Sequence, residues 1–556
     1  MGAYSHHYTF LYSVKLYNNV CIKEDMAMSE SKIVVTNSAI IINNYEMGDC
    51  AQIESCFKVF DPTTHSYYYM GIYYDRDAKK LYLPRGIDIW YVENLFGEDA
   101  NILTNAYDKY HVYEDAMIKY LPRDEIQKEA LRFMLGKDNY YKNQYKSQLS
   151  VNLGTGKGKT YVSIAMLMYT GIRGIVIASS TDWLRQWKDR TVEYSDINQK
   201  DIYIISGSSN ISRLFRMTDS QLDRYKLFLV THDSLRNYGN TYGWNKIGEL
   251  FKKLKIGIKI FDEAHLDFNN ICMIDFFTNT YKTYYLTATP GKSNERENQI
   301  YQTSFKNVPS ITLFNEDTDP HTSYIAIFFN SRPSVAQISG CKNNKYGMDR
   351  NKYTDYVVHQ EEFYKLVYVL MDLTWKLAPN NSDKILIYIG TNKAISYFKS
   401  WIIENMPELS DSIGIYTSVV SAEEKREALN KRIILSTTKS AGAALDVPGL
   451  KITIDLAEPY KSEIIAKQSL GRTRADQTYY IDIIDIGFEQ CRKFYYKKIP
   501  IFEKCAKDCS VIKLSKNELD TRYKTILSDR KYAEQLIMQR SKLELFTKVK
   551  NLFTKV

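Results

Sequence analysis

The sequence lacks paired cysteines, long apolar runs and internal repeats. Its eight cysteines are scattered and none belongs to a Cys-x-x-Cys pair, which argues against a zinc ribbon or a dense disulfide framework. No apolar run approaches the roughly 18 residues of a membrane span, and no basic stretch followed by an apolar one opens the chain. We therefore expect a protein with reduced thiols, without a signal peptide or membrane anchor, in the cytoplasm.

The composition is that of a folded chain with several domains. Its 556 residues are 44% hydrophobic and 25% charged, which is enough to bury several cores. Positive charges exceed negative ones by nine, and residues 521–556 alone hold nine basic and three acidic residues. This basic segment is either a solvated helix face or a contact to DNA. The 46 tyrosines reflect either AT-rich codon usage or aromatic platforms for nucleic-acid bases.

Hydrophobic patterns divide the chain into four parts. Residues 1–120 contain β-branched and tyrosine-rich runs separated by turn signals, which predicts a small β-rich accessory domain. Apolar runs alternate with helix-length segments over residues 121–330 and again over 331–507. This alternation predicts βαβ units and an α/β fold with two tandem parallel-sheet domains. Residues 508–556 are expected to form a basic helical tail.

A phosphate loop follows the predicted strand 148–153 and precedes a predicted helix over 161–169. It consists of Gly154, Thr155, Gly156, Lys157, Gly158, Lys159 and Thr160. The glycines let backbone N–H groups surround phosphate oxygens at a helix N-terminus. Lys159 would reach the β and γ phosphates, and the Thr160 hydroxyl would hold Mg²⁺. Leu153 stands where such loops usually begin with glycine, and a glycine-rich turn without a ligand is the alternative.

Two acidic residues follow the apolar run 256–261, in the segment Asp262-Glu263-Ala264-His265. A carboxylate at the carboxyl end of a buried parallel strand lies where open α/β sheets bind ligands. Asp262 would hold Mg²⁺ through water, and Glu263 would orient and deprotonate the attacking water. These residues together predict hydrolysis of ATP with Mg²⁺ as cofactor.

With these two motifs the chain resembles the DEAH-box helicases and translocases of superfamily 2, whose core is two RecA-like domains. Thr287-Ala288-Thr289 resembles motif III, and the resemblance implies that Thr287, Thr289 and His265 link hydrolysis to movement. Residues 178–187 and 230–235 resemble motifs Ia and Ib, which implies that Ser180, Arg185 and Thr231 contact nucleic acid. Gln127 resembles the adenine-reading Q motif, with an ordinary amphipathic helix as the alternative. Trp183 and Trp187 either stack on bases or pack in the core, and His265 is alternatively a structural histidine.

The resemblance continues into the second predicted domain. Residues 385–391 resemble motif IV, which implies that Thr391 contacts nucleic acid. Thr438 and Asp446 resemble motif V, with Thr438 on nucleic acid and Asp446 on ATP, although Ala444 replaces a usual glycine. Gln468, Arg472 and Arg474 resemble motif VI. The resemblance implies that Gln468 couples hydrolysis to movement and that the two arginines meet the γ-phosphate. Arg474 stands one position earlier than the family pattern.

Within the superfamily, the sequence is most similar to compact phage and viral UvsW-like helicases and more distantly to XPB. The segment 81–86, Leu-Tyr-Leu-Pro-Arg-Gly, resembles a strand and turn of their N-terminal domain. The resemblance implies a monomeric DNA helicase on branched DNA or on single-strand/duplex junctions. Residues 1–120 would bind this DNA. The protein would act in the host cytoplasm, with phage or host replication and recombination proteins as partners. A double-strand translocase or transcript-release factor in viral transcription, and a nucleic-acid scaffold with an inactive motor, are the alternatives.

Overall fold

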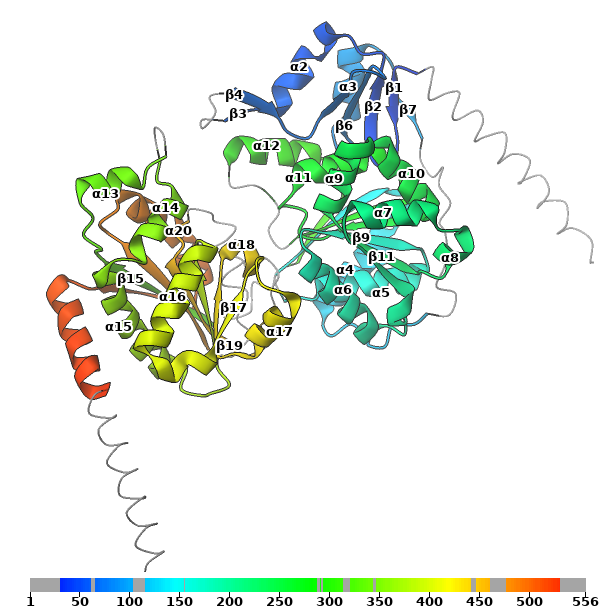
Figure 1. Cartoon of the computed structure of the whole chain (residues 1–556). Coiled ribbons are helices and arrows are strands. Elements are labelled where there is room, and N and C mark those ends of the chain that lie inside the picture. The colour runs from blue at the N-terminus through cyan, green and yellow to red at the C-terminus, as the bar shows by residue number, and fades with distance from the viewer. Residues whose placement is uncertain are drawn as a thin grey trace, which may run out of the picture. The chain divides into compact units, whose positions relative to one another are not determined.

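The computed structural model describes residues 31–61, 66–103, 116–154, 156–287, 291, 294–313, 321–343, 347–441, 447–460 and 477–530. The chain divides into two compact units, Met1–Asn315 and Glu316–Val556. Figure 1 shows the elements of both units. Within the described residues, no helix combines the length and apolar character that crossing a membrane requires.

The first unit opens with a mixed five-stranded sheet in the order β5-β6-β2-β1-β7. Its pairs are antiparallel except β1 with β7, which is parallel. Strands β3 and β4 form a separate two-stranded antiparallel ribbon. The elements are β1 (Ile33–Val35), β2 (Ala39–Asn43), α2 (Met47–Phe57), β3 (Lys58–Asp61), β4 (Ser66–Tyr69), β5 (Tyr73–Asp75), β6 (Lys80–Pro84), α3 (Ile89–Phe96) and β7 (Asn101–Ile102).

A seven-stranded sheet forms the rest of the first unit, in the order β10-β11-β9-β12-β13-β8-β14. All neighbours in it are parallel. Its strands are β8 (Gln148–Leu153), β9 (Gly174–Ala178), β10 (Ile202–Ile205), β11 (Leu227–Thr231), β12 (Ile258–Phe261), β13 (Lys282–Thr287) and β14 (Ser310–Leu313). The central strands are rich in Ile, Val and Leu and fully buried, as expected for a parallel sheet covered by helices on both faces.

The helices around this sheet are α4 (Glu125–Leu135), α5 (Lys159–Thr170), α6 (Thr181–Tyr194), α7 (Gly207–Arg216), α8 (Asp219–Asp223), α9 (His232–Tyr242), α10 (Asn245–Lys253), α11 (Phe268–Phe277) and α12 (Glu295–Ser304). Two 3₁₀ helices, η1 (Asp138–Tyr145) and η2 (Gln199–Asp201), lie in the same described part of the chain. In the strand order, β13 lies between β8 and β12. The carboxyl ends of these three strands therefore place the phosphate loop, Thr287 and Asp262 at one edge of the sheet.

The β-rich region shares its core with the first parallel-sheet domain. Phe268, Cys272 and Phe276 of α11 belong to the same buried cluster as the strands β1, β2 and β6. The side-chain amide of Asn37 also donates to the carbonyl oxygen of Thr280 at 3.1 Å. The two parts form one packed unit, because residues of both bury the same apolar surface.

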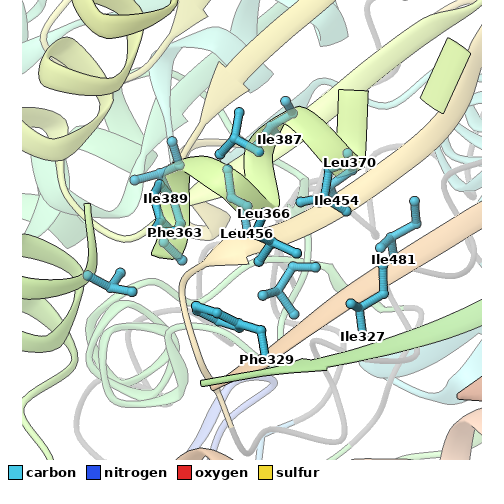
Figure 2. Close-up of a cluster of buried hydrophobic side chains, with 14 of the residues drawn as sticks. Ile327, Phe329, Phe363, Leu366, Leu370, Ile387, Ile389, Ile454, Leu456 and Ile481 are labelled. Atoms are coloured by element: carbon cyan, nitrogen blue, oxygen red, sulfur yellow. The ribbon is translucent and has the colours of Figure 1, made fainter. Parts of the chain in front are cut away.

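The second unit contains another seven-stranded parallel sheet, in the order β17-β18-β16-β19-β20-β15-β21. Its strands are β15 (Thr322–Phe329), β16 (Lys384–Ile389), β17 (Ile413–Tyr416), β18 (Ile433–Ser436), β19 (Leu450–Ala457), β20 (Thr478–Asp485) and β21 (Asp508–Lys513). The helices are α13 (Val335–Gly340), α14 (Arg350–Val357), α15 (Glu361–Leu377), α16 (Asn392–Asn405), η3 (Pro407–Ser412), α17 (Ala422–Asn430), α18 (Thr438–Ala441) and α20 (Glu489–Cys505). In its core, Phe363, Leu366 and Leu370 of α15 lie among aliphatic side chains of the sheet (Figure 2).

The two tandem parallel sheets and the β-rich N-terminal region confirm the predicted fold class. Two of the expected boundaries were wrong. Thr322–Phe329 were placed at the end of the first domain, yet they form β15 of the second sheet, because β20 and β21 pair with them on both sides. A tail that is helical from residue 508 is also wrong: Asp508–Lys513 form the edge strand β21, and in the part of the tail that the structure describes the helix spans residues 516–530.

Candidate nucleotide-binding site

The phosphate loop begins directly after β8 and ends in the first turn of α5. Its backbone turns tightly, because the N–H of Lys157 donates to the carbonyl oxygen of Gly154 at 3.1 Å. Gly156 and Gly158 adopt left-handed φ angles of 76° and 92°, which side chains other than glycine rarely adopt. Lys159 and Thr160 are the first two residues of α5. The loop therefore presents the N-terminus of a twelve-residue helix, the arrangement that favours a phosphate.

Gln127 packs directly on this loop. Its side-chain amide donates to the carbonyl oxygen of Lys157 at 3.4 Å and accepts from the N–H of Arg123 at 2.9 Å. A Cβ at Gly158 would lie 2.3 Å from Nε2 of Gln127, so the close contact requires glycine. Gln127 is buried. The amphipathic helix α4 thus carries a glutamine that contacts the phosphate loop, and its adenine-reading role stays a prediction.

Glu263 and Lys159 form an ion pair that is partly buried. Nζ of Lys159 lies 2.7 Å from Oε1 of Glu263, and their side chains are 13% and 6% exposed. Glu263 itself has a left-handed φ of 49°, a strained conformation for this residue type. Its Oε2 accepts no hydrogen bond from the described residues, although Nδ1 of His265 lies 3.4 Å away. The predicted phosphate-binding lysine and the predicted base therefore meet at one point.

Asp262 is held by two hydrogen bonds. The indole N–H of Trp187 donates to Oδ2 at 2.7 Å, and the backbone N–H of Glu263 donates to Oδ1 at 3.0 Å. Burial and then the charge of Glu263 raise the pKa of Asp262 to about 6, while Lys159 and the Trp187 hydrogen bond act in the opposite direction. Trp187 is 2% exposed, so it packs in the core and is not available for base stacking.

His265 joins the acidic segment to the end of β13. Its Nδ1 lies 2.8 Å from Oγ1 of Thr287, and both residues are buried. The backbone also connects the two segments, since the N–H of Ala264 donates to the carbonyl oxygen of Leu286 at 2.9 Å. The side chain of His265 therefore lies between Glu263 and Thr287.

Three of the predicted nucleic-acid contacts are N-cap residues of helices. The side chains of Ser180, Thr231 and Thr391 accept hydrogen bonds from the first turns of α6, α9 and α16. Each lies where a parallel strand gives way to a helix, so it stands beside backbone N–H groups that attract phosphate. Arg185 is on the same helix as Ser180, and its guanidinium contacts Asp182 at 2.9 Å.

Thr438 in the second unit is engaged by an acidic residue. Its backbone N–H and its hydroxyl both donate to the carboxylate of Glu458, at 2.7 and 2.5 Å. A phosphate at Thr438 would have to replace this carboxylate. Six predicted site residues lie outside the described residues: Thr155, Thr289, Asp446, Gln468, Arg472 and Arg474.

The residues brought together fit a nucleotide with magnesium. The carboxylates of Asp262 and Glu263 are hard oxygen donors, which magnesium prefers, and Glu263 contacts the lysine that begins α5. The Thr160 hydroxyl adjoins that lysine in the chain. The hydrogen bond from Trp187 to Asp262 was not predicted from the sequence, because helical spacing alone indicates only that Trp187 packs in the core. The available signal was chemical, since a buried indole N–H needs an acceptor.

Comparison with known proteins finds a family model and viral relatives that match this chain. A model of the family "Type III restriction enzyme, res subunit" matches residues 120–292. Transcript termination protein A18 of Yaba-like disease virus is 23% identical over 472 residues, which cover 82% of this chain and 86% of the relative. The protein of the same name from Yaba monkey tumor virus (strain VR587) is 23% identical over 338 residues, 58% of this chain and 64% of the relative.

Solved structures similar to this chain include S. cerevisiae Dbp5 bound to RNA and ADP BeF3. It is 14% identical with a TM-score of 0.45, over 73% of this chain and 93% of that one. T4 UvsW is 14% identical with a TM-score of 0.33, over 87% of this chain and 100% of that one. The family match spans the phosphate loop and the Asp262-Glu263-Ala264-His265 segment. The predicted resemblance to helicases is therefore confirmed over residues 120–292, where the chain is similar to the res subunit of type III restriction enzymes.

Proposed function

We propose that this chain is an ATPase, stimulated by nucleic acid, that moves along DNA and releases transcripts. The ATPase part is supported above all by the 2.7 Å contact between Lys159 and Glu263 beside Asp262. The transcript-release part is supported by the two viral relatives, which bear the name transcript termination protein.

The catalytic step follows from the groups at this site. ATP would bind with its phosphates at the N-terminus of α5, and Lys159 would leave Glu263 for the phosphate oxygens. Magnesium, held by Asp262 and the Thr160 hydroxyl, would neutralise phosphate charge. Glu263, released from the lysine, would then take a proton from the attacking water. Arg472 and Arg474 of the second domain are proposed to place positive charge at the γ-phosphate. His265 and Thr287 are proposed to couple hydrolysis to movement.

The test is ATP hydrolysis by the purified chain, titrated with single-stranded DNA, duplex DNA, a fork, a four-way junction and RNA. The proposal predicts that at least one DNA raises turnover and that labelled RNA is released from stalled transcription complexes only with hydrolysable ATP. Turnover that no nucleic acid raises would overturn it and revive the scaffold alternative.

A second candidate is a helicase on forked or branched DNA. It is supported by the β-rich region, which shares a core with the first parallel-sheet domain and so offers a second surface next to the motor. Strand displacement on forks, compared with blunt duplexes, separates the two candidates. A helicase displaces a strand at the fork, whereas a double-strand translocase hydrolyses ATP on both substrates without displacing one.

A further inference from the structure

One face of the ribbon β3–β4 consists of three aromatic rings and a lysine. Lys58 lies opposite Tyr69, and Phe60 lies opposite Tyr67. Because alternate residues of a strand point to the same side, these four side chains share one face, called here the ribbon face. Figure 1 shows the ribbon next to α2 and α12 of the same unit.

The ribbon face is exposed, and two of its rings pack against each other. Phe60, Tyr67 and Tyr69 are 45%, 60% and 42% exposed. The rings of Phe60 and Tyr67 are 5.2 Å apart, and Nζ of Lys58 lies 4.3 Å from the centre of the Tyr67 ring. Three large aromatic side chains that remain this exposed on one small face indicate a binding surface.

The opposite face of the ribbon is fixed to the motor. Val59 is buried, and the hydroxyl of Tyr68 donates to Oε1 of Glu297 at 2.8 Å. The guanidinium of Arg296 donates to the carbonyl oxygens of Lys58 and Ser55 at 3.0 and 2.6 Å. Both Arg296 and Glu297 belong to α12, which follows the segment Thr287-Ala288-Thr289 in the chain. The ribbon is thus held to α12 by the side chains of these two residues.

We propose that the ribbon face binds the bases of single-stranded nucleic acid. Aromatic rings stack on any base, and the lysine beside them, the one charged group on this face, fits the backbone phosphate. The neighbouring acidic residue Glu54 is engaged by the hydroxyls of Tyr69 and Tyr74. The face carries no aliphatic side chain among its four residues, which favours planar bases over a protein surface. The inference deepens the proposed function, on which it rests, by assigning the strand contact to particular residues.

The test measures the affinity of the full chain, without ATP, for labelled single-stranded DNA, single-stranded RNA and blunt duplex. The double variant Phe60→Ala/Tyr67→Ala should bind single strands roughly 10- to 100-fold more weakly, since each stacked base contributes substantially to affinity. Its dependence on salt should stay unchanged, because the rings neutralise no phosphate. Lys58→Ala should instead reduce the salt slope by about 0.7. Tyr67→Phe, which keeps the ring, should bind single strands like the parent.

Trp90→Ala is the matched control, because Trp90 is a large aromatic residue that is 68% exposed in the same region but belongs to α3 and not to the ribbon. It should leave affinity within about twofold of the parent. If the parent binds single strands and the double variant binds them equally well, or loses duplex affinity to the same extent, the inference is wrong while the proposed function stands. If the parent binds no nucleic acid, the proposed function itself fails.

Discussion

The indole N–H of Trp187 donates a 2.7 Å hydrogen bond to Oδ2 of Asp262, and both groups are buried. This bond joins helix α6, whose N-cap is the predicted nucleic-acid contact Ser180, to the predicted magnesium ligand. It also fixes the second carboxylate oxygen, because Oδ1 already accepts from the N–H of Glu263. The orientation of Asp262 therefore depends on a residue of a different motif.

Trp187→Phe removes this donor while keeping an aromatic ring of similar shape. A hydrogen bond to a charged group is worth about 1.5–3 kcal/mol, so we expect the magnesium requirement for nucleotide binding to rise roughly 10-fold or more. Binding of a fluorescent ATP analogue over a range of magnesium concentrations measures this without hydrolysis. Trp183→Phe, in the same helix one turn earlier and also buried, should leave the requirement unchanged. Equal effects of both variants would show that Trp187 acts through packing alone.

Glu263→Gln should strengthen ATP binding. In the parent, phosphate must replace the carboxylate that holds Lys159, and a hydrogen bond between charged groups costs about 1.5–3 kcal/mol to break. Without the negative charge, we expect the Kd for ATP to fall at least about threefold, as measured by equilibrium binding. Lys159→Ala should weaken binding instead. A weaker affinity in Glu263→Gln would mean that this contact does not compete with the nucleotide.

Gly158→Ala should damage the phosphate loop for two separate reasons. The new Cβ would strike Nε2 of Gln127, and the left-handed φ of 92° disfavours alanine. We expect the KM for ATP to rise at least about 10-fold. The double variant Gly158→Ala/Gln127→Ala removes the clash but keeps the backbone strain, so its KM for ATP should return only part of the way to the parent value. Full recovery would show that the side-chain clash is the whole effect.

His232 should make the first unit sensitive to acid. It is fully buried, lies against the ring of Phe261, and neither ring nitrogen has a hydrogen-bond partner among the described residues. Burial lowers the pKa of His232 from 6.5 to about 4, with Asp267 and Asp233 acting in the opposite direction. The stability linked to the neutral ring is therefore complete above pH 6.5 and is lost as the pH falls toward 4.

The pH slope of the free energy of unfolding measures this effect. One proton contributes at most about 1.4 kcal/mol per pH unit between these values. His232→Phe keeps the stacked ring without titrating, so its slope should be smaller by up to that amount. Hydrogen exchange of peptides from β11 and β12 reports the local unfolding. Identical slopes in both proteins would mean that His232 is protonated in the folded state.

Much of the fold was predictable because buried parallel strands leave a strong pattern. The strand expected over residues 148–153 matches the observed Gln148–Leu153 residue for residue, and the predicted alternation of strands and helices gives two parallel sheets. The edge strand Asp508–Lys513 was not predictable in this way, because it is exposed and polar and owes its form to pairing with β15.

The site was predictable where the chemistry lies within one short segment. The phosphate loop and the Asp262-Glu263 pair are of this kind, and their meeting follows from the strand order. The contacts of Gln127 with the loop, of Trp187 with Asp262 and of Glu458 with Thr438 join residues distant in the sequence. Such contacts depend on tertiary packing, which no local pattern records.

The most direct test of the central claim is steady-state ATP hydrolysis by the full chain and by Glu263→Gln, with and without single-stranded DNA. The account predicts that DNA raises turnover of the parent, and that the variant binds ATP but turns over roughly 10²- to 10⁴-fold more slowly, because the water loses its base. Turnover of the variant within about threefold of the parent would remove Glu263 from catalysis. A parent that hydrolyses no ATP in the presence of DNA would contradict the account as a whole.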